Sequence, residues 1–447
     1  MMLAVVSALS GQADVSRRFS TAEDRFHQVG VVSPVTASQS QKVAPELPSE
    51  IAPTTGASPG TEWKLLLAAI SASPEKVDDW PGRLQQNVVW PKLLRLADHH
   101  GVSSLLYQSL CSMGDSAAPA EALRSLRRRH DINVHKCLFL TRELVRILDH
   151  LDSLGIEVMP YKGVVLSQTL YGDMALRQSG DMDLLVRAND LPRAKKKVYE
   201  LGYTSHLTLS EAAERAYVRS GYECTFDHAG SRNLLELQWA LQPNFYSVDF
   251  GMSGVFRRAV TVSLAGRQAK TPSPEDLLLI LSVHAAKHVW GRLIWLCDIA
   301  QLTKRPDLNW DWITSQAKAL GIERIMHVTL LLAKSLLGTE IPPLPNSTLL
   351  SDAASHTLAD SIRIEMANGV SCNVESLDYF RLMMRLRERR ADRLRFLGRL
   401  TFTPGPGEWK AIQLPARLFP LYRVVRLWRL TARLFRGRSG TVSAPPL

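Results

Sequence analysis

The feature that most constrains the fold is the stretch RQSGDMDLLV, residues 177–186, in which two carboxylates open an apolar run. Leu184–Val186 predict a buried strand. Asp181 and Asp183 lie at its mouth, where a charge is costly unless something compensates it. The candidates are a metal ion, a nearby cation and solvent at the strand end.

The composition is that of a globular protein with its basic charge at one end. The chain has 447 residues, 45% of them hydrophobic, and no apolar run approaches the ~20 residues of a membrane-spanning helix. Five scattered cysteines without CxxC spacing argue against disulfides or zinc and predict a reducing, cytoplasmic setting. Residues 381–447 hold sixteen Lys and Arg against three acids, so this segment carries a charge of +13. The net charge of the whole chain is +11, so the remaining residues sum to −2. That asymmetry weakens a nucleic-acid interpretation of the whole chain.

The pattern along the chain divides it into five segments. Residues 1–60, rich in Ser, Thr, Ala, Val, Pro and Gln, predict a disordered leader. Helical periodicity follows in an N-terminal segment, 61–154. Strand and helix signals alternate over 155–250, and helical patterns return over 251–400. Residues 401–447 form a basic amphipathic tail.

This order predicts an α+β fold, in which a small mixed sheet with helices is flanked by N-terminal and C-terminal helical segments. Residues 156–163 and 181–187 are expected as strands. YECTFDHAGSRNLLELQWAL predicts a hairpin around residues 228–231, and Asn189 or Asp190 is expected to cap the helix before it. Ser273 is expected to cap a helical stretch that runs on through residues 284–302.

A strand would direct Asp181 and Asp183 to the same face, roughly 6–7 Å apart, while Met182 and Leu184 face the core. Paired carboxylates suit Mg²⁺, which takes one or two of them beside water and phosphate. Glu236, inside the apolar run LLELQWAL, would complete a three-carboxylate site if its strand lies beside the first. The alternative is that a DxD pair is solvated at a strand end. Gly163 would let backbone amides approach a phosphate, beside the charge of Lys162.

These motifs together resemble an uncharacterised nucleotidyltransferase family of the DNA polymerase beta superfamily. The similarity runs from Lys-Gly through DMDLLV and the helix ending in Gly-Tyr to LLELQWAL and HAAKHVWGRLIWLCDIAQL, over roughly residues 62–330. Two positions depart from the family pattern. Val164 stands where a Ser often follows the Gly, and Gln238 where many members have His.

The resemblance implies Mg²⁺-dependent transfer of a nucleotide from ATP or another nucleoside triphosphate to a hydroxyl acceptor, with release of pyrophosphate. The acceptor would be a sugar, small metabolite, protein or RNA. The implied site residues divide into the ligands of two Mg²⁺ ions, which are also the catalytic acids (Asp181, Asp183, Glu236), and the nucleotide contacts (Lys162, Gly163, Arg177, His284, Lys287, His288, Arg292).

His284 and His288, four residues apart, share a helix face. Zinc would need further ligands, since HAAKH lacks the Glu of HExxH. A core or capping role and a place in the nucleotide cleft are the other interpretations. Asp298 is expected to pair with Arg292 or a His of the same helix.

The segment LYRVVRLWRLTARLFRGR places five arginines on one helical stripe: Arg423, Arg426, Arg429, Arg433 and Arg436. Residues 420–438 are therefore typical of a helix at an anionic membrane surface, here the inner membrane. A helix that packs its apolar face on the body with solvated arginines is an equal alternative, and nucleic-acid contact a weaker one. The two functional alternatives to an enzyme are an inactive nucleotide-binding protein of the same fold and a membrane-surface adaptor.

Overall fold

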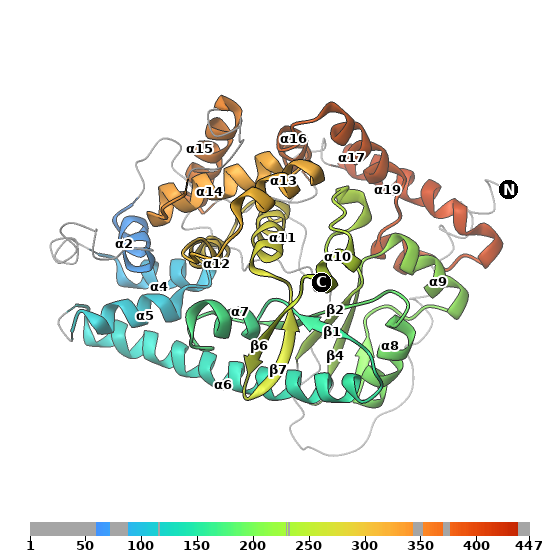
Figure 1. Cartoon of the computed structure of the whole chain (residues 1–447). Helices are drawn as coiled ribbons and strands as arrows, with labels where there is room; N and C mark the ends of the chain where they lie inside the picture. Colours follow the sequence, from blue (N-terminus) through green and yellow to red (C-terminus); the bar gives the residue numbers. More distant parts are fainter. Residues whose placement is uncertain are drawn as a thin grey trace, which may run out of the picture. The chain divides into compact units, whose positions relative to one another are not determined.

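The computed structural model describes residues 60–71, 88–114, 117–228, 230, 233–342, 352–369 and 376–436 (Figure 1). The predicted leader up to residue 59, Ala229 and Ser231 of the predicted hairpin turn, and the tail beyond residue 436 lie outside these ranges. Helices and two small sheets make up the described chain, which confirms the predicted α+β class.

A five-stranded mixed sheet forms the centre of the predicted nucleotidyltransferase core. Its strands lie in the order β1-β2-β5-β4-β3, and only the central pair, β2 and β5, is parallel. Their bounds are β1 Val158–Pro160, β2 Asp181–Val186, β3 Tyr203–Ser205, β4 Glu223–His228 and β5 Leu234–Gln238. The antiparallel pair β4 and β5 is the predicted hairpin. A separate ribbon pairs β6 Val260–Leu264 with β7 Arg267–Thr271.

Helices precede, interrupt and follow the sheet. The N-terminal helices are α2 Thr61–Ile70, α4 Trp90–His99, α5 Ser103–Ser112 and the long α6 Ala120–Asp152. Within the sheet region lie α7 Val164–Leu166, the π-helical turn Ser167–Tyr171, α8 Leu191–Glu200 and α9 Glu211–Ser220. The short turn Asn244–Tyr246 and α10 Met252–Arg257 lead to α11 Pro274–Lys287, α12 Leu293–Thr303, α13 Trp310–Leu320 and α14 Glu323–Leu337. The remaining helices are α15 Ala353–Ala367, α16 Leu377–Arg385, α17 Arg390–Phe402, α18 Pro406–Ala411, the 3-10 turn Ala416–Leu421 and α19 Tyr422–Arg436.

The two faces of β2 belong to two different hydrophobic cores. Met182, Leu184 and Val186 pack with apolar residues of α6 and α8 in one core. Leu185, on the opposite face, belongs to the core built by the N-terminal helices and α11 to α14. Asp181 shares that second face by strand alternation. The acids therefore lie on the side of the sheet that faces the C-terminal helices, while the other side is apolar.

Local signals explain several helix ends. The Ser273 hydroxyl accepts a hydrogen bond from the Asp276 backbone N–H, so the predicted cap of α11 is confirmed. Asp190 occupies the cap position of α8 but makes no side-chain cap bond. The predicted single helical stretch through residues 284–302 is wrong, because α11 ends at Lys287 and α12 begins at Leu293. Val289 and Trp290 between them have φ of 52° and 48°, a left-handed conformation that no helix continues.

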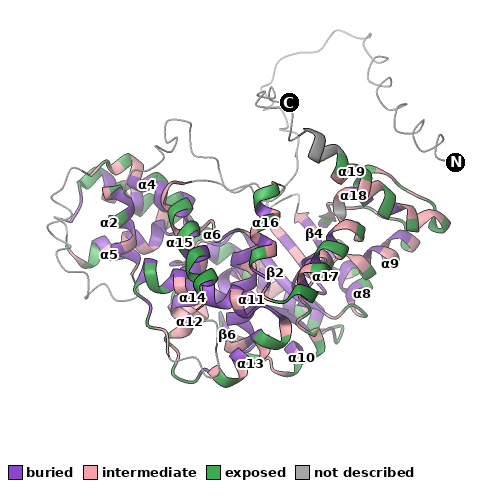
Figure 2. Cartoon of the chain, turned by 90° about the horizontal axis from the view of Figure 1, so that it is seen from above, coloured by how far each residue is buried: buried purple, intermediate pink, exposed green. Residues whose placement is uncertain are grey.

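The tail helix α19 directs two of its arginines at the body of the protein. Tyr422 at its start is buried in the sheet-side core. Arg426 and Arg429 face the body and pair with Glu408 of α18, whereas Val424 and Trp428 are exposed. The alternative of an apolar face packed on the body with solvated arginines is therefore wrong for these side chains. Figure 2 shows exposed residues along α17 and α19. Among the described residues, no helix combines the length and apolar character needed to cross a membrane.

Candidate active site

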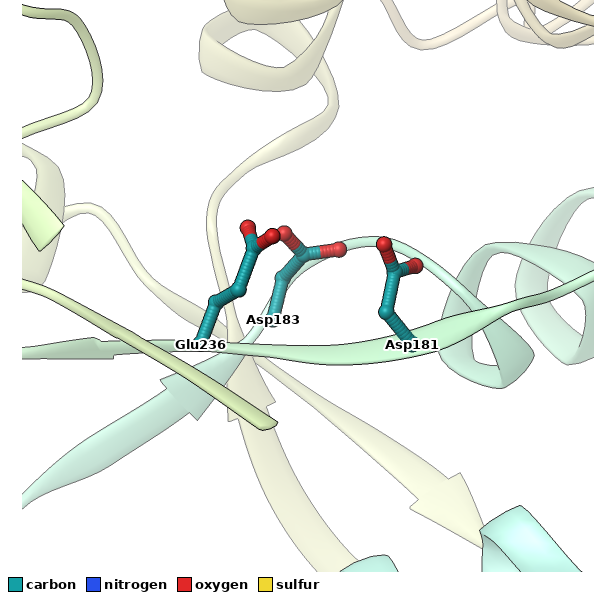
Figure 3. A group of neighbouring side chains, drawn as sticks. All are labelled: Asp181, Asp183 and Glu236. Carbon is teal, nitrogen blue, oxygen red and sulfur yellow. The ribbon is translucent and has the colours of Figure 1, made fainter. Parts of the chain in front are cut away.

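Three carboxylates converge on one face of the sheet. The parallel register of β2 and β5 places Asp183 directly beside Glu236, and Asp181 two residues earlier shares the same face. One oxygen from each carboxylate lies within 4.8 Å of the other two. Figure 3 shows all three side chains rising from the same side of their strands. The structure thus brings together the three acids that the sequence predicted, including the one contributed by a distant segment.

Lys162 contacts this cluster from the turn after β1. Its Nζ lies 3.0 Å from Asp183 Oδ1, and both side chains are nearly buried. Burial alone would lower the pKa of Lys162, but Asp183, Tyr161 and Glu236 outweigh it and raise that pKa well above its ordinary value. The ammonium therefore stays charged, and it supplies the nearby cation that the sequence left as one alternative.

Gln238 links two of the acids. Its side-chain N–H group donates to Asp183 Oδ1 at 3.1 Å and to Glu236 Oε2 at 2.9 Å, while its carbonyl accepts from the Tyr161 hydroxyl at 2.5 Å. Lys162 Nζ in turn lies 4.6 Å from the centre of the Tyr161 ring. The amide thus fixes the spacing of neighbouring carboxylates without adding charge.

Gly163 is required by the closeness of two backbone segments. It has φ 62°, and a Cβ at this position would lie 3.0 Å from the backbone oxygen of Asp181. A side chain would therefore be strained and would press on the start of β2. The Lys-Gly turn thus lies directly against the strand that carries the acids.

The oxygen-only donor set fits Mg²⁺. Hard divalent cations prefer carboxylate oxygens, and two adjacent acids with a third nearby match the ligands that Mg²⁺ takes in phosphate-handling sites. Asp181, Asp183 and Glu236 are the one group of three potential metal ligands within the described ranges. His284 and His288 are not part of such a group there, so the zinc interpretation gains no support.

The C-terminal helices contribute aromatic and cationic groups. The ring centres of His284 and His288 lie 4.9 Å apart with the planes tilted by 59°, and each ring centre lies within 5.5 Å of that of Trp295. Lys287 Nζ lies 5.4 Å from the centre of the Tyr222 ring. Burial raises the pKa of the Tyr222 hydroxyl well above normal, and the charges of Glu223 and Glu236 raise it further.

Arg292, in the loop between α11 and α12, is electrostatically linked to the acids. Burial lowers its pKa, and the charge of Asp181 opposes that effect. His100, in the turn between α4 and α5, lies beside this loop: its carbonyl accepts from the Ile294 N–H at 3.2 Å. Burial, helped by His99 and Arg292, lowers the pKa of His100 to about 3.

Arg177 is held by a buried ion pair. Its Nε lies 3.0 Å from both carboxylate oxygens of Asp298, and the Tyr171 hydroxyl donates to Asp298 at 3.0 Å. Burial opposes the charge on Arg177, but Asp298 outweighs it and raises the pKa of the guanidinium. The expected pairing of Asp298 with Arg292 or a His is therefore wrong, because the partner comes from the segment leading into β2.

Sequence reasoning missed several residues around the acids: Tyr161, Tyr222 and Glu223. Glu223 lies opposite Gln238 in the β4–β5 register, and the two side chains are 3.5 Å apart. A sequence-based assignment of the exact β4–β5 register would have placed Glu223 opposite Gln238. No sequence signal marked Tyr161, whose role comes from a contact across 77 positions.

The fold and site define a class of protein with a carboxylate cluster on a small mixed sheet. The chain matches the model of a family described as "Uncharacterised nucleotidyltransferase" over residues 86–338, more than half its length. It therefore belongs to this nucleotidyltransferase family. A search of curated proteins gives no match.

Two solved structures show a weak likeness. ANT(2″)-Ia in complex with adenylyl-2″-tobramycin is 14% identical with a TM-score of 0.24, covering 51% of this chain and 98% of that one. A nucleotidyltransferase-like protein from Paracoccidioides brasiliensis is 17% identical with a TM-score of 0.27, covering 45% of this chain and 93% of that one. These scores are too low to support an argument about this chain.

Proposed function

We propose that this protein is a Mg²⁺-dependent enzyme that transfers a nucleoside monophosphate from a nucleoside triphosphate to a hydroxyl acceptor and releases pyrophosphate. The observation that carries the proposal is the convergence of Asp181, Asp183 and Glu236, with ligand oxygens within 4.8 Å of one another. Family membership supports the general reaction. We place the enzyme in the cytoplasm, where nucleoside triphosphates are available.

Asp181 and Asp183 would hold two Mg²⁺ ions, and Glu236 would share one of them. Bound there, Mg²⁺ lowers the pKa of the acceptor hydroxyl and neutralises charge on the triphosphate and the departing pyrophosphate. The chain's own groups position the reactants and keep the acids apart.

The positioning groups come from both sides of the acids. Lys162 is the proposed contact to the phosphates, since its raised pKa keeps the ammonium charged. Gly163 beside it has no side chain that would keep a phosphate from the backbone. Gln238 holds Asp183 and Glu236 at their spacing. Lys287 and Arg292 are proposed to line the nucleotide cleft from the C-terminal helices, together with the neighbouring His284 and His288. Arg177 is proposed to act indirectly, because its ion pair with Asp298 fixes the segment that leads into β2.

A direct test incubates the full chain with each of the four α-labelled nucleoside triphosphates, Mg²⁺ and cell extract. Label should enter an acceptor with the wild type and fall by at least about a thousandfold with Asp183→Asn, because a metal ligand is lost. Asp227→Asn, which alters an exposed acid of β4, is the matched control and should keep activity. Substantial activity of Asp183→Asn would refute the assignment.

The Lys162–Asp183 ion pair favours a second candidate, an inactive nucleotide-binding protein of the same fold. An ammonium bound to Asp183 at 3.0 Å already balances part of the charge that Mg²⁺ would neutralise. Calorimetric titration separates the two candidates. The enzyme should bind Mg²⁺ with a nucleoside triphosphate and turn it over, whereas the alternative would bind nucleotide with no dependence on Mg²⁺ and form no product.

A further inference from the structure

Two large apolar side chains are exposed on α19. Val424 and Trp428, one helical turn apart, are 55% and 57% exposed. The neighbouring α17, whose Leu400 carbonyl accepts from Arg426 of α19, exposes Phe402 at 53% and Leu394 at 70%. Val424 and Trp428 lie on one side of α19, and large apolar side chains exposed together on a helix indicate an interaction surface. We call Val424 and Trp428 the tail surface.

A buried acid holds α19 in this orientation. Glu408 is 2% exposed and lies within 3.4 Å of both Arg426 and Arg429. Gly407 makes room for this contact, since a Cβ there would lie 2.7 Å from the Arg429 guanidinium. Arg426 and Arg429 therefore face inward, whereas Arg423 is exposed together with Val424 and Trp428. Without this contact, an amphipathic helix would be expected to pack the other way round.

Among the described side chains of residues 381–431, every exposed charged group is a cation. The three acids of residues 381–447 are Glu388, Asp392 and Glu408, and none of them is exposed. Exposed cations surround them on α17, α18, the turn before α19 and α19 itself: Arg390, Lys410, Arg417 and Arg423. This surface combines outward apolar side chains with uncompensated positive charge.

We propose that the tail surface docks on an anionic lipid bilayer. Trp and Val side chains enter the headgroup boundary, and the flanking cations attract anionic headgroups. A second copy of this chain fits less well, because two strongly positive surfaces would face each other. Nucleic acid would satisfy the cations but leave the aliphatic side chains without a partner. The proposal is independent of the catalytic assignment.

The test is cosedimentation of the full chain with vesicles of phosphatidylcholine containing 30% phosphatidylglycerol. Binding should be at least about tenfold weaker on pure phosphatidylcholine and should fall with added salt, because the charges act within a Debye length. Trp428→Glu and Arg423→Glu should each weaken binding about tenfold. Ile132→Glu, at a 59% exposed position of α6, is the matched control and should bind as the wild type does.

Three results would overturn the proposal. One is equal binding of wild type and Trp428→Glu while circular dichroism shows both folded. Another is concentration-dependent dimerisation that Trp428→Glu abolishes, without vesicle binding by the wild type. The last is tight binding of RNA that is insensitive to Trp428→Glu, again with no retention on anionic vesicles.

Discussion

Replacing Asp298 with Asn tests whether its buried ion pair with Arg177 stabilises the segment that leads into β2. The two side chains are 8% and 0% exposed, so the variant leaves a guanidinium away from water without its counter-charge. Losing one partner of such a pair typically costs ~3–5 kcal/mol. The Tyr171 hydroxyl, 3.0 Å from Asp298, adds a charged hydrogen bond, so Tyr171→Phe should cost ~1.5–3 kcal/mol.

Urea unfolding at pH 7, followed by tryptophan fluorescence, measures these losses. The double variant Arg177→Met with Asp298→Leu should recover most of the stability, because an apolar replacement removes both charges. Asp307→Asn is the matched control. It alters an ion pair of 2.8 Å whose side chains are 40% and 62% exposed, and should cost less than ~1 kcal/mol. An Asp298→Asn loss no larger than that of this control would show that the buried pair does not anchor the segment leading into β2. A double variant whose loss equals the sum of the losses of Arg177→Met and Asp298→Leu would show the same.

Further variants examine the turn, the pH response and the tail. Gly163→Ala should lower the free energy of unfolding by ~1–3 kcal/mol in thermal melts, whereas Gly172→Ala, also left-handed but with open space around its Cβ, should cost only ~1 kcal/mol; equal costs would contradict the close contact with β2. The buried His100 stays neutral when folded, because its pKa is lowered to about 3, while the unfolded chain takes up a proton below pH 6.5. Stability should therefore be lost as pH falls from 6.5 towards 3, by up to ~1.4 kcal/mol per pH unit from this group, and His100→Phe should show a shallower decline in urea titrations; an unchanged slope would refute it. Glu408→Gln should release α19 and speed its cleavage by trypsin, and an unaltered digestion rate would show that the ion pairs do not hold the helix.

Local patterns predicted the parts of the fold that depend on neighbouring residues. The strand at Asp181 follows from an apolar run, the β4–β5 hairpin from its turn residues and the Ser273 cap from a serine at the start of a helical pattern. The convergence of Glu236 with the aspartates also followed, because an acid inside an apolar strand calls for a partner nearby. What these signals share is that the residue types restrict the conformation where they stand.

Other contacts between distant segments were not predictable. The partner of Asp298 lies 121 positions away, so nothing in its own helix marks Arg177. The orientation of α19 depends on Glu408 in another helix, which outweighs the apolar pattern of α19 itself. The break between α11 and α12 requires two non-glycine residues in the left-handed region, a conformation that propensity argues against and that the buried Trp290 helps to hold.

The pairing of β2 with β5 has a consequence for how sequences of this kind can diverge. Moving β5 by a single position along β2 would turn Glu236 into the apolar layer and bring Leu235 or Leu237 to the acids. Connections between these strands can lengthen or shorten outside the sheet, but an insertion or deletion inside either strand would dismantle the carboxylate group in one step. Natural variation in length should therefore gather in the turns, with the two strand segments kept constant.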